Sequence, residues 1–136
     1  MIRYGKSTQN AIAAMSRLSE AYKGGVRLSS RDIAKARDLS QTLIAKILTQ
    51  LSQAGMVSGA TGPGGGYSLA KPPSEISLYD IAAIFERVED KITCPFGPCW
   101  CGTRKPCPLH TKLIKLDAEF ENFLKTATLD IFSPAS

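Results

Sequence analysis

The chain is poor in the residues that usually carry catalysis. Its 136 residues include only one histidine and one tryptophan, and its aromatic content is 7%. No Ser-His-Asp arrangement, pair of catalytic carboxylates or zinc-protease pattern is present, so general acid–base chemistry has few candidates. We therefore expect that the chain is not an enzyme, with a small metal-dependent enzyme as the weakest of the functional classes.

Long apolar runs are also missing. No apolar signal segment follows Met1, and the longest apolar runs are far too short to cross a bilayer. These absences predict a cytoplasmic protein with no membrane partner. Lasting disulfides are uncommon in that reducing compartment. With 43% apolar residues, the chain can bury a small core and is expected to form one compact unit.

Cysteine is scarce but concentrated. All four cysteines and the only histidine lie within seventeen residues that also contain four prolines and two glycines. They are Cys94, Cys99, Cys101, Cys107 and His110. Because prolines and glycines interrupt regular structure, residues 94–110 are expected to form a loop. Thiolates and imidazoles coordinate iron and other metals, so the sequence predicts an iron–sulfur cluster or a metal ion in this loop.

Two other interpretations of this loop remain open. Three cysteines and a histidine are a common structural zinc set, although zinc sites usually contain a Cys-x-x-Cys pair, which is missing here. Redox sensing by the thiols alone, without a metal, is the second. Cys107 suits any of these roles, because it lies near the expected start of a helix and close to Arg104 and Lys105, which together stabilise a thiolate.

Charge is distributed unevenly along the chain. The formal net charge is +5, and residues 1–60 hold nine Lys or Arg against three acidic residues. Residues 61–136 hold eight basic against nine acidic residues. A basic amino-terminal half is typical of a surface that faces nucleic-acid phosphates. A dimeric adaptor that binds no DNA has no need of this charge.

Three helices are expected in the basic half. Apolar residues recur at helical spacing over residues 8–22 and 40–54, and a shorter helix is expected after Ser29. Ser29 and Ser40 have the character of N-cap residues. The second and third helices form a helix-turn-helix pattern, in which the polar face of the third reads base edges. The predicted DNA contacts are Arg31, Lys35, Ser40, Gln41, Thr42, Ala45 and Lys46.

A glycine-rich hairpin is expected directly after the third helix. Residues 56–58 and 67–69 have strand character, and the Gly-Pro-Gly-Gly-Gly run at residues 62–66 forms the turn. Helix, turn, helix and hairpin is the order of a winged helix. Glycines let the backbone approach a phosphate or a minor groove closely. The predicted DNA contacts of this wing are Gly64, Gly65 and Tyr67.

The carboxy-terminal half is expected to contain two further helices. One covers residues 77–90 and leads into the cysteine loop, and a long one covers residues 108–127. In the long helix, large apolar residues recur at spacings of 4, 3, 4, 3 and 4, which is a heptad-type seam, and Ile114 and Leu124 widen it. The seam predicts a homodimer. Its predicted interface residues are Leu109, Leu113, Leu116, Phe120 and Phe123.

The chain resembles bacterial winged-helix transcription regulators of the IscR and NsrR type, the Rrf2 family. The likeness rests on the run from Gly62 to Tyr67 with the residues before it, 51–57, and on the Cys-Pro-Leu-His run at residues 107–110. It covers nearly the full length. It implies a mainly α fold with a small β-hairpin, in which residues 1–72 form a winged helix-turn-helix. Residues 73–136 would hold a helix, the cysteine-rich loop and a long dimerisation helix.

The resemblance also implies a function. Such proteins are homodimers that bind double-stranded DNA at a two-fold-related operator and control transcription. Many sense iron, redox state or nitric oxide through an iron–sulfur cluster, which can be absent after purification. The alternative function is a thiol-redox or zinc-dependent DNA-binding regulator without such a cluster.

A ligand set follows from the same resemblance. Relatives that bind a cluster commonly have three cysteines separated by five and five residues, and a histidine three positions after the last. The implied ligands here are Cys94, Cys101, Cys107 and His110, with Cys99 as the alternative to Cys101. Some relatives that hold a four-iron cluster take an acidic ligand from the first helix, but residues 8–10 contain no acid. A two-iron (2Fe-2S) cluster is therefore expected rather than a four-iron (4Fe-4S) one.

Overall fold

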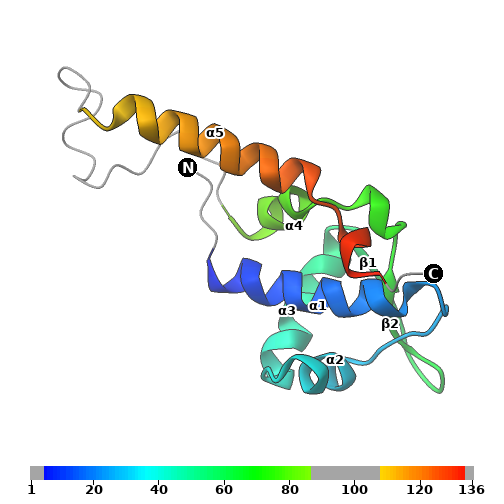
Figure 1. Ribbon diagram of the computed structural model, residues 1–136. Helices are drawn as coiled ribbons and strands as arrows, with labels where there is room; N and C mark the ends of the chain where they lie inside the picture. Colours follow the sequence, from blue (N-terminus) through cyan, green and yellow to red (C-terminus); the bar gives the residue numbers. More distant parts are fainter. Residues whose placement is uncertain (1–4, 87–107, 134–136) are drawn as a thin grey trace.

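The computed structural model describes residues 5–86 and 108–133 (Figure 1). Its elements are α1 (Lys6–Tyr22), α2 (Ser30–Arg37), α3 (Gln41–Gln53), β1 (Val57–Ala60), β2 (Gly66–Leu69), η1 (Pro73–Glu75), α4 (Leu78–Phe85), α5 (His110–Thr126) and η2 (Leu129–Phe132). The two strands pair antiparallel. The predicted class, mainly α with a small β-hairpin, is therefore confirmed.

Helix α1 is the centre of the fold. It runs across the middle of the molecule, with α2 and α3 on one side and α4 and α5 on the other (Figure 1). Fully buried apolar side chains of several elements meet around it. The largest are Met15, Leu18, Ile33, Ile44, Ile47, Leu48, Leu51, Ile76, Ile81, Leu124 and Leu129. Because α1 also contacts η2, the end of the chain is tied to the amino-terminal half.

Capping boxes begin α2 and α4, as the Ser-x-x-Asp pattern predicts. At α2, the Asp32 amide donates to Ser29 Oγ at 3.1 Å, and the Ser29 amide donates to Asp32 Oδ2 at 3.2 Å. Ser77 and Asp80 make the same pair of bonds at α4, both at 3.1 Å. The bond from the Ser29 amide lowers the pKa of Asp32. The capping box of Ser29 and Asp32 therefore adds to the free energy of unfolding at pH values above the usual pKa of an aspartate. This contribution is lost as the pH falls through the lowered pKa of Asp32.

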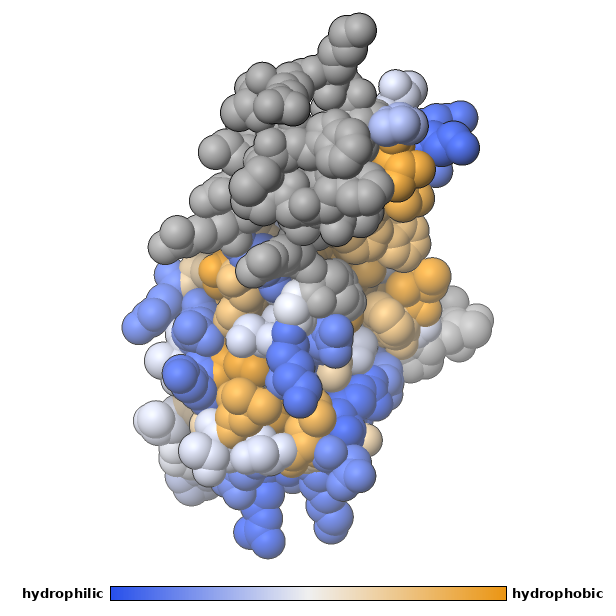
Figure 2. Space-filling view, turned by 90° about the vertical axis from the view of Figure 1, so that its left-hand side faces the viewer, coloured by the Kyte–Doolittle hydropathy of each residue, from blue (hydrophilic) through white to orange (hydrophobic). Residues whose placement is uncertain are grey.

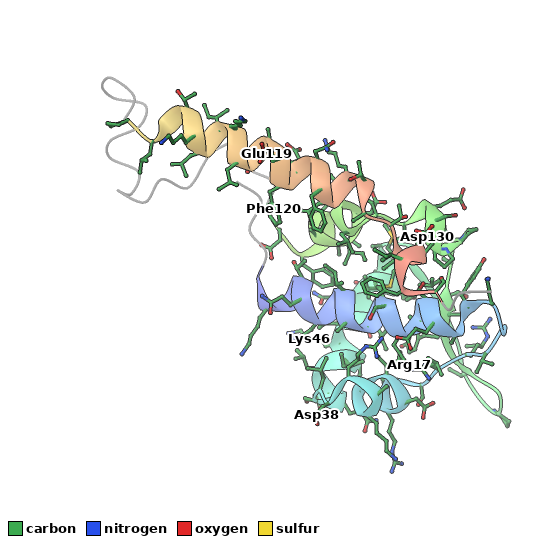
Figure 3. The ribbon with its side chains drawn as sticks, in the orientation of Figure 1. Arg17, Asp38, Lys46, Glu119, Phe120 and Asp130 are labelled. Atoms are coloured by element: carbon green, nitrogen blue, oxygen red, sulfur yellow. The ribbon has the colours of Figure 1, made fainter. Side chains whose placement is uncertain are left out.

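The turn between α2 and α3 depends on an unusual backbone conformation at Asp38. Its φ of 53° and ψ of 51° are left-handed, and it is the only non-glycine residue with positive φ in the described part of the chain. Its amide closes α2 by donating to the carbonyls of Ala34 and Lys35. Two residues later, Ser40 Oγ caps α3 by accepting from the Leu43 amide at 3.4 Å. Figure 3 shows Asp38 at the outer edge of the molecule, between the two helices.

Asp38→Gly is expected to raise the free energy of unfolding by roughly 0.5–1 kcal/mol. Glycine adopts the left-handed conformation without steric cost, and the change removes a negative charge from the carboxyl end of α2. Asp38→Ala is the control, because it removes the same charge and keeps the strain. Urea denaturation of the three proteins measures the difference, and an alanine variant as stable as the glycine variant would refute the role of the backbone.

Helix α4 ends earlier than expected. Its last residue is Phe85, whereas the sequence predicted an end near Asp90. Glu86 has an extended backbone, and its carboxylate Oε1 accepts from the Gly5 amide at 2.7 Å and from Thr8 Oγ1 at 2.8 Å. Thr8 is fully buried. Glu86 thus caps the start of α1 from 81 residues away, a long-range contact that helical periodicity does not encode.

Other boundaries differ by less. Before α2, Leu28 forms a single antiparallel bridge with Tyr67 of β2. The last helix begins at His110, because the residues just before it form a turn. Within residues 5–86 and 108–133, no helix combines the length and apolar character needed to cross a membrane. The division of the chain at residue 72 stays a prediction.

The segment after α5 fixes that helix to the rest of the molecule. The Leu78 amide donates to the Ala127 carbonyl at 2.9 Å, and the Leu129 amide donates to the Ile76 carbonyl at 2.9 Å. The buried Ser19 hydroxyl of α1 donates to the Leu129 carbonyl at 2.8 Å. The carboxyl end of α5 is therefore held by α1 and by the start of α4. Its first turns extend past both helices (Figure 1).

Candidate nucleic-acid interface

The start of α3 presents a polar, exposed surface. Ser40, Gln41, Thr42 and Lys46 are exposed, and Ala45 is partly exposed. The opposite face of the helix packs into the core through four buried residues, Ile44, Ile47, Leu48 and Leu51. This burial fixes the orientation of α3 against α1 and α2. The five predicted contacts of α3 and its cap therefore lie together on one free face, available for reading base edges in a major groove.

Beside this face lies one exposed residue that the sequence pattern did not identify. Leu43 is 37% exposed, and between residues 27 and 86 it is the only exposed large apolar side chain. It follows Gln41 and Thr42 in the first turn of α3 and lies outside the buried stripe of that helix. Leu43 is four residues before Ile47, which is the spacing of the buried stripe itself, so the sequence carried no signal for its exposure.

Only two of the three basic residues of α2 are exposed to solvent. Arg31 and Lys35 are exposed and lie one helical turn apart. Arg37 instead faces α1, where its guanidinium donates to the Ala13 carbonyl at 3.3 Å and to Ser16 Oγ at 3.1 Å. It also forms an ion pair with Glu20. Arg37 therefore holds α2 against α1, and Arg31 and Lys35 are left as the exposed basic residues of α2.

Arg17 is a second basic residue with an intramolecular partner. Its Nη1 lies 3.5 Å from Glu20 Oε2, on the same carboxylate that Arg37 contacts. Figure 3 shows Arg17 on α1 on the side of α2. Further along α3, the Thr49 hydroxyl donates to the Ala45 carbonyl at 3.0 Å. The predicted DNA contacts of the helices that are exposed therefore lie on the first turns of α3 and on the outer side of α2.

The tip of the hairpin needs glycine at two positions for steric reasons. A Cβ on Gly65 would lie 2.5 Å from the Ala60 carbonyl oxygen, and one on Gly66, whose φ is 127°, would lie 2.8 Å from the Leu28 backbone. The Gly65 amide donates to the Gly62 carbonyl at 2.9 Å, so it is used within the turn. A Cβ on Gly64 would meet no atom within 4 Å. The same holds for Gly62, so Gly62 and Gly64 are the sterically unobstructed positions of the predicted wing.

Tyr67 anchors the hairpin to the segment before α2. The Leu28 amide donates to the Tyr67 carbonyl at 2.9 Å, and the Tyr67 amide donates to the Leu28 carbonyl at 2.7 Å. Its ring lies against Gly59, where an added Cβ would be 3.1 Å from Cε1. These contacts set the position of the wing relative to the helix-turn-helix. They give Tyr67 a structural role besides the DNA contact that the sequence predicts.

The apolar seam of α5 divides into two sides. Leu109, Leu116 and Phe123 follow one another at intervals of seven residues and are 38%, 53% and 55% exposed. Phe120 packs partly against the core, where Figure 3 shows it between α5 and α4, and Leu124 is fully buried. The seam was predicted as a single interface. In the structure, the fully buried Leu124 belongs to the protein's own core.

Hydrophobic surface remains uncovered at the start of α5. Ile114 is 43% exposed, and Leu113 is partly exposed beside it. Figure 2 shows orange surface next to the grey residues, at the end of the molecule where α5 begins. This uncovered stripe is the structural basis for the expected dimer contact.

The predicted ligand loop lies outside the described residues. This applies to Cys94, Cys99, Cys101 and Cys107, and His110 is described only as the first residue of α5, without its side chain. Elsewhere, in the part of the chain that is described, no group of three or more His, Cys, Asp or Glu residues could hold a metal ion. The ligand set therefore stays a prediction.

The described start of α5 is compatible with a nearby anionic group. Its N-cap residue, Leu109, provides no side-chain hydrogen bond, and its first turn contains no acidic residue. Amides at a helix start carry partial positive charge and stabilise a thiolate. Cys107 precedes Leu109 by two residues in the sequence.

The sequence model of the Rrf2 family, described as an iron-dependent transcriptional regulator, matches residues 4–133. The chain belongs to the Rrf2 family. An HTH-type transcriptional regulator of Aquifex aeolicus is 33% identical over 100 residues, which cover 72% of this chain and 69% of that protein. The IscR regulator of Vibrio vulnificus is 32% identical over 99 residues, 72% of this chain and 58% of its own length.

Solved structures support the same fold for this Rrf2 chain. CymR, named as the global cysteine regulator of B. subtilis, matches with a TM-score of 0.76 at 23% identity and covers 97% of both chains. IscR of T. potens matches with a TM-score of 0.75 at 23% identity, over 95% of this chain and 85% of the other. The predicted winged-helix architecture is confirmed. As an Rrf2 member, the chain is a DNA-binding transcription regulator rather than an enzyme.

Proposed function

We propose that this Rrf2 protein acts in the cytoplasm as a homodimer, and that two copies of α3 read a two-fold-related operator in double-stranded DNA. The exposed polar start of α3 is the observation that carries this proposal. Gln41 suits adenine, Thr42 can bond to several bases, and Lys46 suits guanine or a phosphate. A dimer of winged helices contacts half-sites about one helical turn apart, so symmetry in the protein implies symmetry in the operator.

The remaining contacts hold the protein on the DNA backbone. Arg31 and Lys35 lie on α2 with exposed side chains. Gly64 is an exposed position of the wing, where no neighbouring atom would block the approach of the DNA backbone. Charged contacts of this kind position a protein on DNA without reading its sequence. Ser40, the exposed N-cap residue of α3, contacts the same backbone in this proposal.

We further propose that residues 94–110 sense the signal through an iron–sulfur cluster. The chemistry of the donor set fits a cluster, because three thiolates and one imidazole are sufficient ligands, and two of the four, Cys107 and His110, come at the start of α5 in the sequence. Cys94, Cys101, Cys107 and His110 would hold it. When bound, a cluster supplies a reversible one-electron centre that also reacts with oxidants. A two-iron cluster remains preferred.

Sensing by thiols or zinc, without an iron–sulfur cluster, is the second candidate. CymR, a cysteine regulator by its name, has this fold at 23% identity. The fold is therefore compatible with different signals, and the choice depends on residues 94–110.

Selection from a random DNA library tests the DNA-binding proposal. The expected result is an enriched sequence with two inverted half-sites. On that sequence, Gln41→Ala should cost roughly 1–3 kcal/mol of binding free energy and relax preference at one base pair per half-site. Arg31→Ala should weaken binding to all sequences about equally and reduce the salt dependence. Selection of a single, unrepeated half-site would contradict the dimeric proposal.

A further inference from the structure

Leu43 is exposed where the proposed function needs hydrogen-bonding groups. Its side chain is 37% exposed in the first turn of α3, next to Gln41 and Thr42. Exposing a large apolar side chain to water brings no stability, and no other large apolar residue between residues 27 and 86 is as exposed as Leu43. An isolated exposed leucine has no significance by itself, but this one lies in the first turn of α3, at the edge of the surface assigned to base reading.

The backbone holds Leu43 in a defined place. Its amide donates to Ser40 Oγ at 3.4 Å, in the N-cap of α3, and the Ile44 amide donates to the Ser40 carbonyl at 3.0 Å. The neighbouring Ile44 is fully buried. The cap hydrogen bonds and the buried Ile44 thus fix the first turn of α3 relative to the core. Leu43 would therefore meet the same part of the DNA in each half-site.

The major groove offers one apolar feature among its base edges. Adenine, guanine and cytosine present hydrogen-bond donors and acceptors there, whereas thymine also presents a C5-methyl group. A leucine side chain has no group that can hydrogen-bond to the polar base edges, and it would displace the water molecules that do so. It can make van der Waals contact with a methyl group and remove both surfaces from water.

We infer that Leu43 contacts a thymine methyl group in each half-site and selects thymine at that position. This inference rests on the proposed function, since it requires α3 to enter the major groove. It assigns a different kind of recognition from Gln41, Thr42 and Lys46. Those residues hydrogen-bond, while Leu43 distinguishes thymine by its methyl group alone.

Replacement of thymine by deoxyuridine tests the inference on the unmodified protein. Deoxyuridine pairs as thymine does and lacks only the methyl group. The duplex selected from the random library is synthesised with deoxyuridine at each thymine in turn, in both half-sites together. At one thymine we expect an affinity loss of about fourfold per half-site, or roughly fifteenfold for the symmetric change, from the lost burial of one methyl group.

Leu43→Ala identifies the side chain responsible. This variant should bind the thymine duplex about as weakly as the wild type binds the deoxyuridine duplex, and it should no longer distinguish the two. Leu43→Met, which keeps an apolar side chain of similar size, should retain the discrimination. Ile131→Ala is the matched control, because Ile131 is 76% exposed on η2 and should leave binding to both duplexes unchanged.

Failure of this inference can be separated from failure of the proposed function. If no sequence is enriched from the library, base reading by α3 is wrong. If a sequence is enriched but deoxyuridine has no effect at any position, or the same effect in the wild type and in Leu43→Ala, then Leu43 does not contact a thymine methyl group. Thermal unfolding of Leu43→Ala shows whether a general loss of binding comes from misfolding.

Discussion

The combined change Leu116→Glu and Phe123→Glu is expected to convert the protein to monomers. Both side chains are more than half exposed on the outer side of α5, so the charges cost little in a monomer. In a dimer each would be buried without a partner, which typically costs about 3–5 kcal/mol. Sedimentation velocity measures the loss, which should exceed a hundredfold in the dimer dissociation constant.

Ala118→Glu is the matched control for this prediction. Ala118 is exposed on α5 and lies on roughly the opposite side of the helix from Leu116, so it receives the same charge outside the seam. This variant should remain dimeric. Phe120 is unsuitable as a test position, because it packs partly against the protein's own core and its loss would destabilise the monomer. A double variant that stays dimeric would place the interface elsewhere.

Cys107→Ala is expected to lose bound iron and acid-labile sulfide completely. The same loss is expected for Cys94→Ala and Cys101→Ala, because each would remove one of the proposed cluster ligands. Cys99→Ala is the internal control and should retain both elements. The four variants are prepared anaerobically and analysed for iron, sulfide and zinc.

The same series decides between Cys99 and Cys101. Loss of iron in Cys99→Ala with retention in Cys101→Ala would exchange their roles. Retention of iron and sulfide in Cys107→Ala would contradict the proposed site, whichever of the two is the ligand.

The sequence predicts the helices of this fold because their signals are local. Ser29 and Ser77 with their partner acids mark two helix starts, and the apolar stripe of α3 matches its buried face residue by residue. The hairpin follows from its glycines, and Gly65 and Gly66 are required by contacts that any side chain would violate.

Contacts between distant residues explain what the sequence did not predict. Glu86 ends α4 and caps α1, and neither role follows from residues near it in the chain. Arg37 is one of the nine basic residues counted in residues 1–60, yet its side chain is paired with Ser16 and Glu20 of α1. The exposure of Leu43 likewise became evident only once the packing of α3 was known.

The proposed cluster is tested most directly by the content of iron, acid-labile sulfide and zinc in the wild-type protein purified without oxygen. A two-iron cluster predicts about two irons and two sulfides per chain, with the absorbance of such a cluster. The same preparation should lose both elements on oxidation. Stoichiometric zinc without sulfide would contradict the proposed cluster and leave a winged-helix regulator that senses by another chemistry.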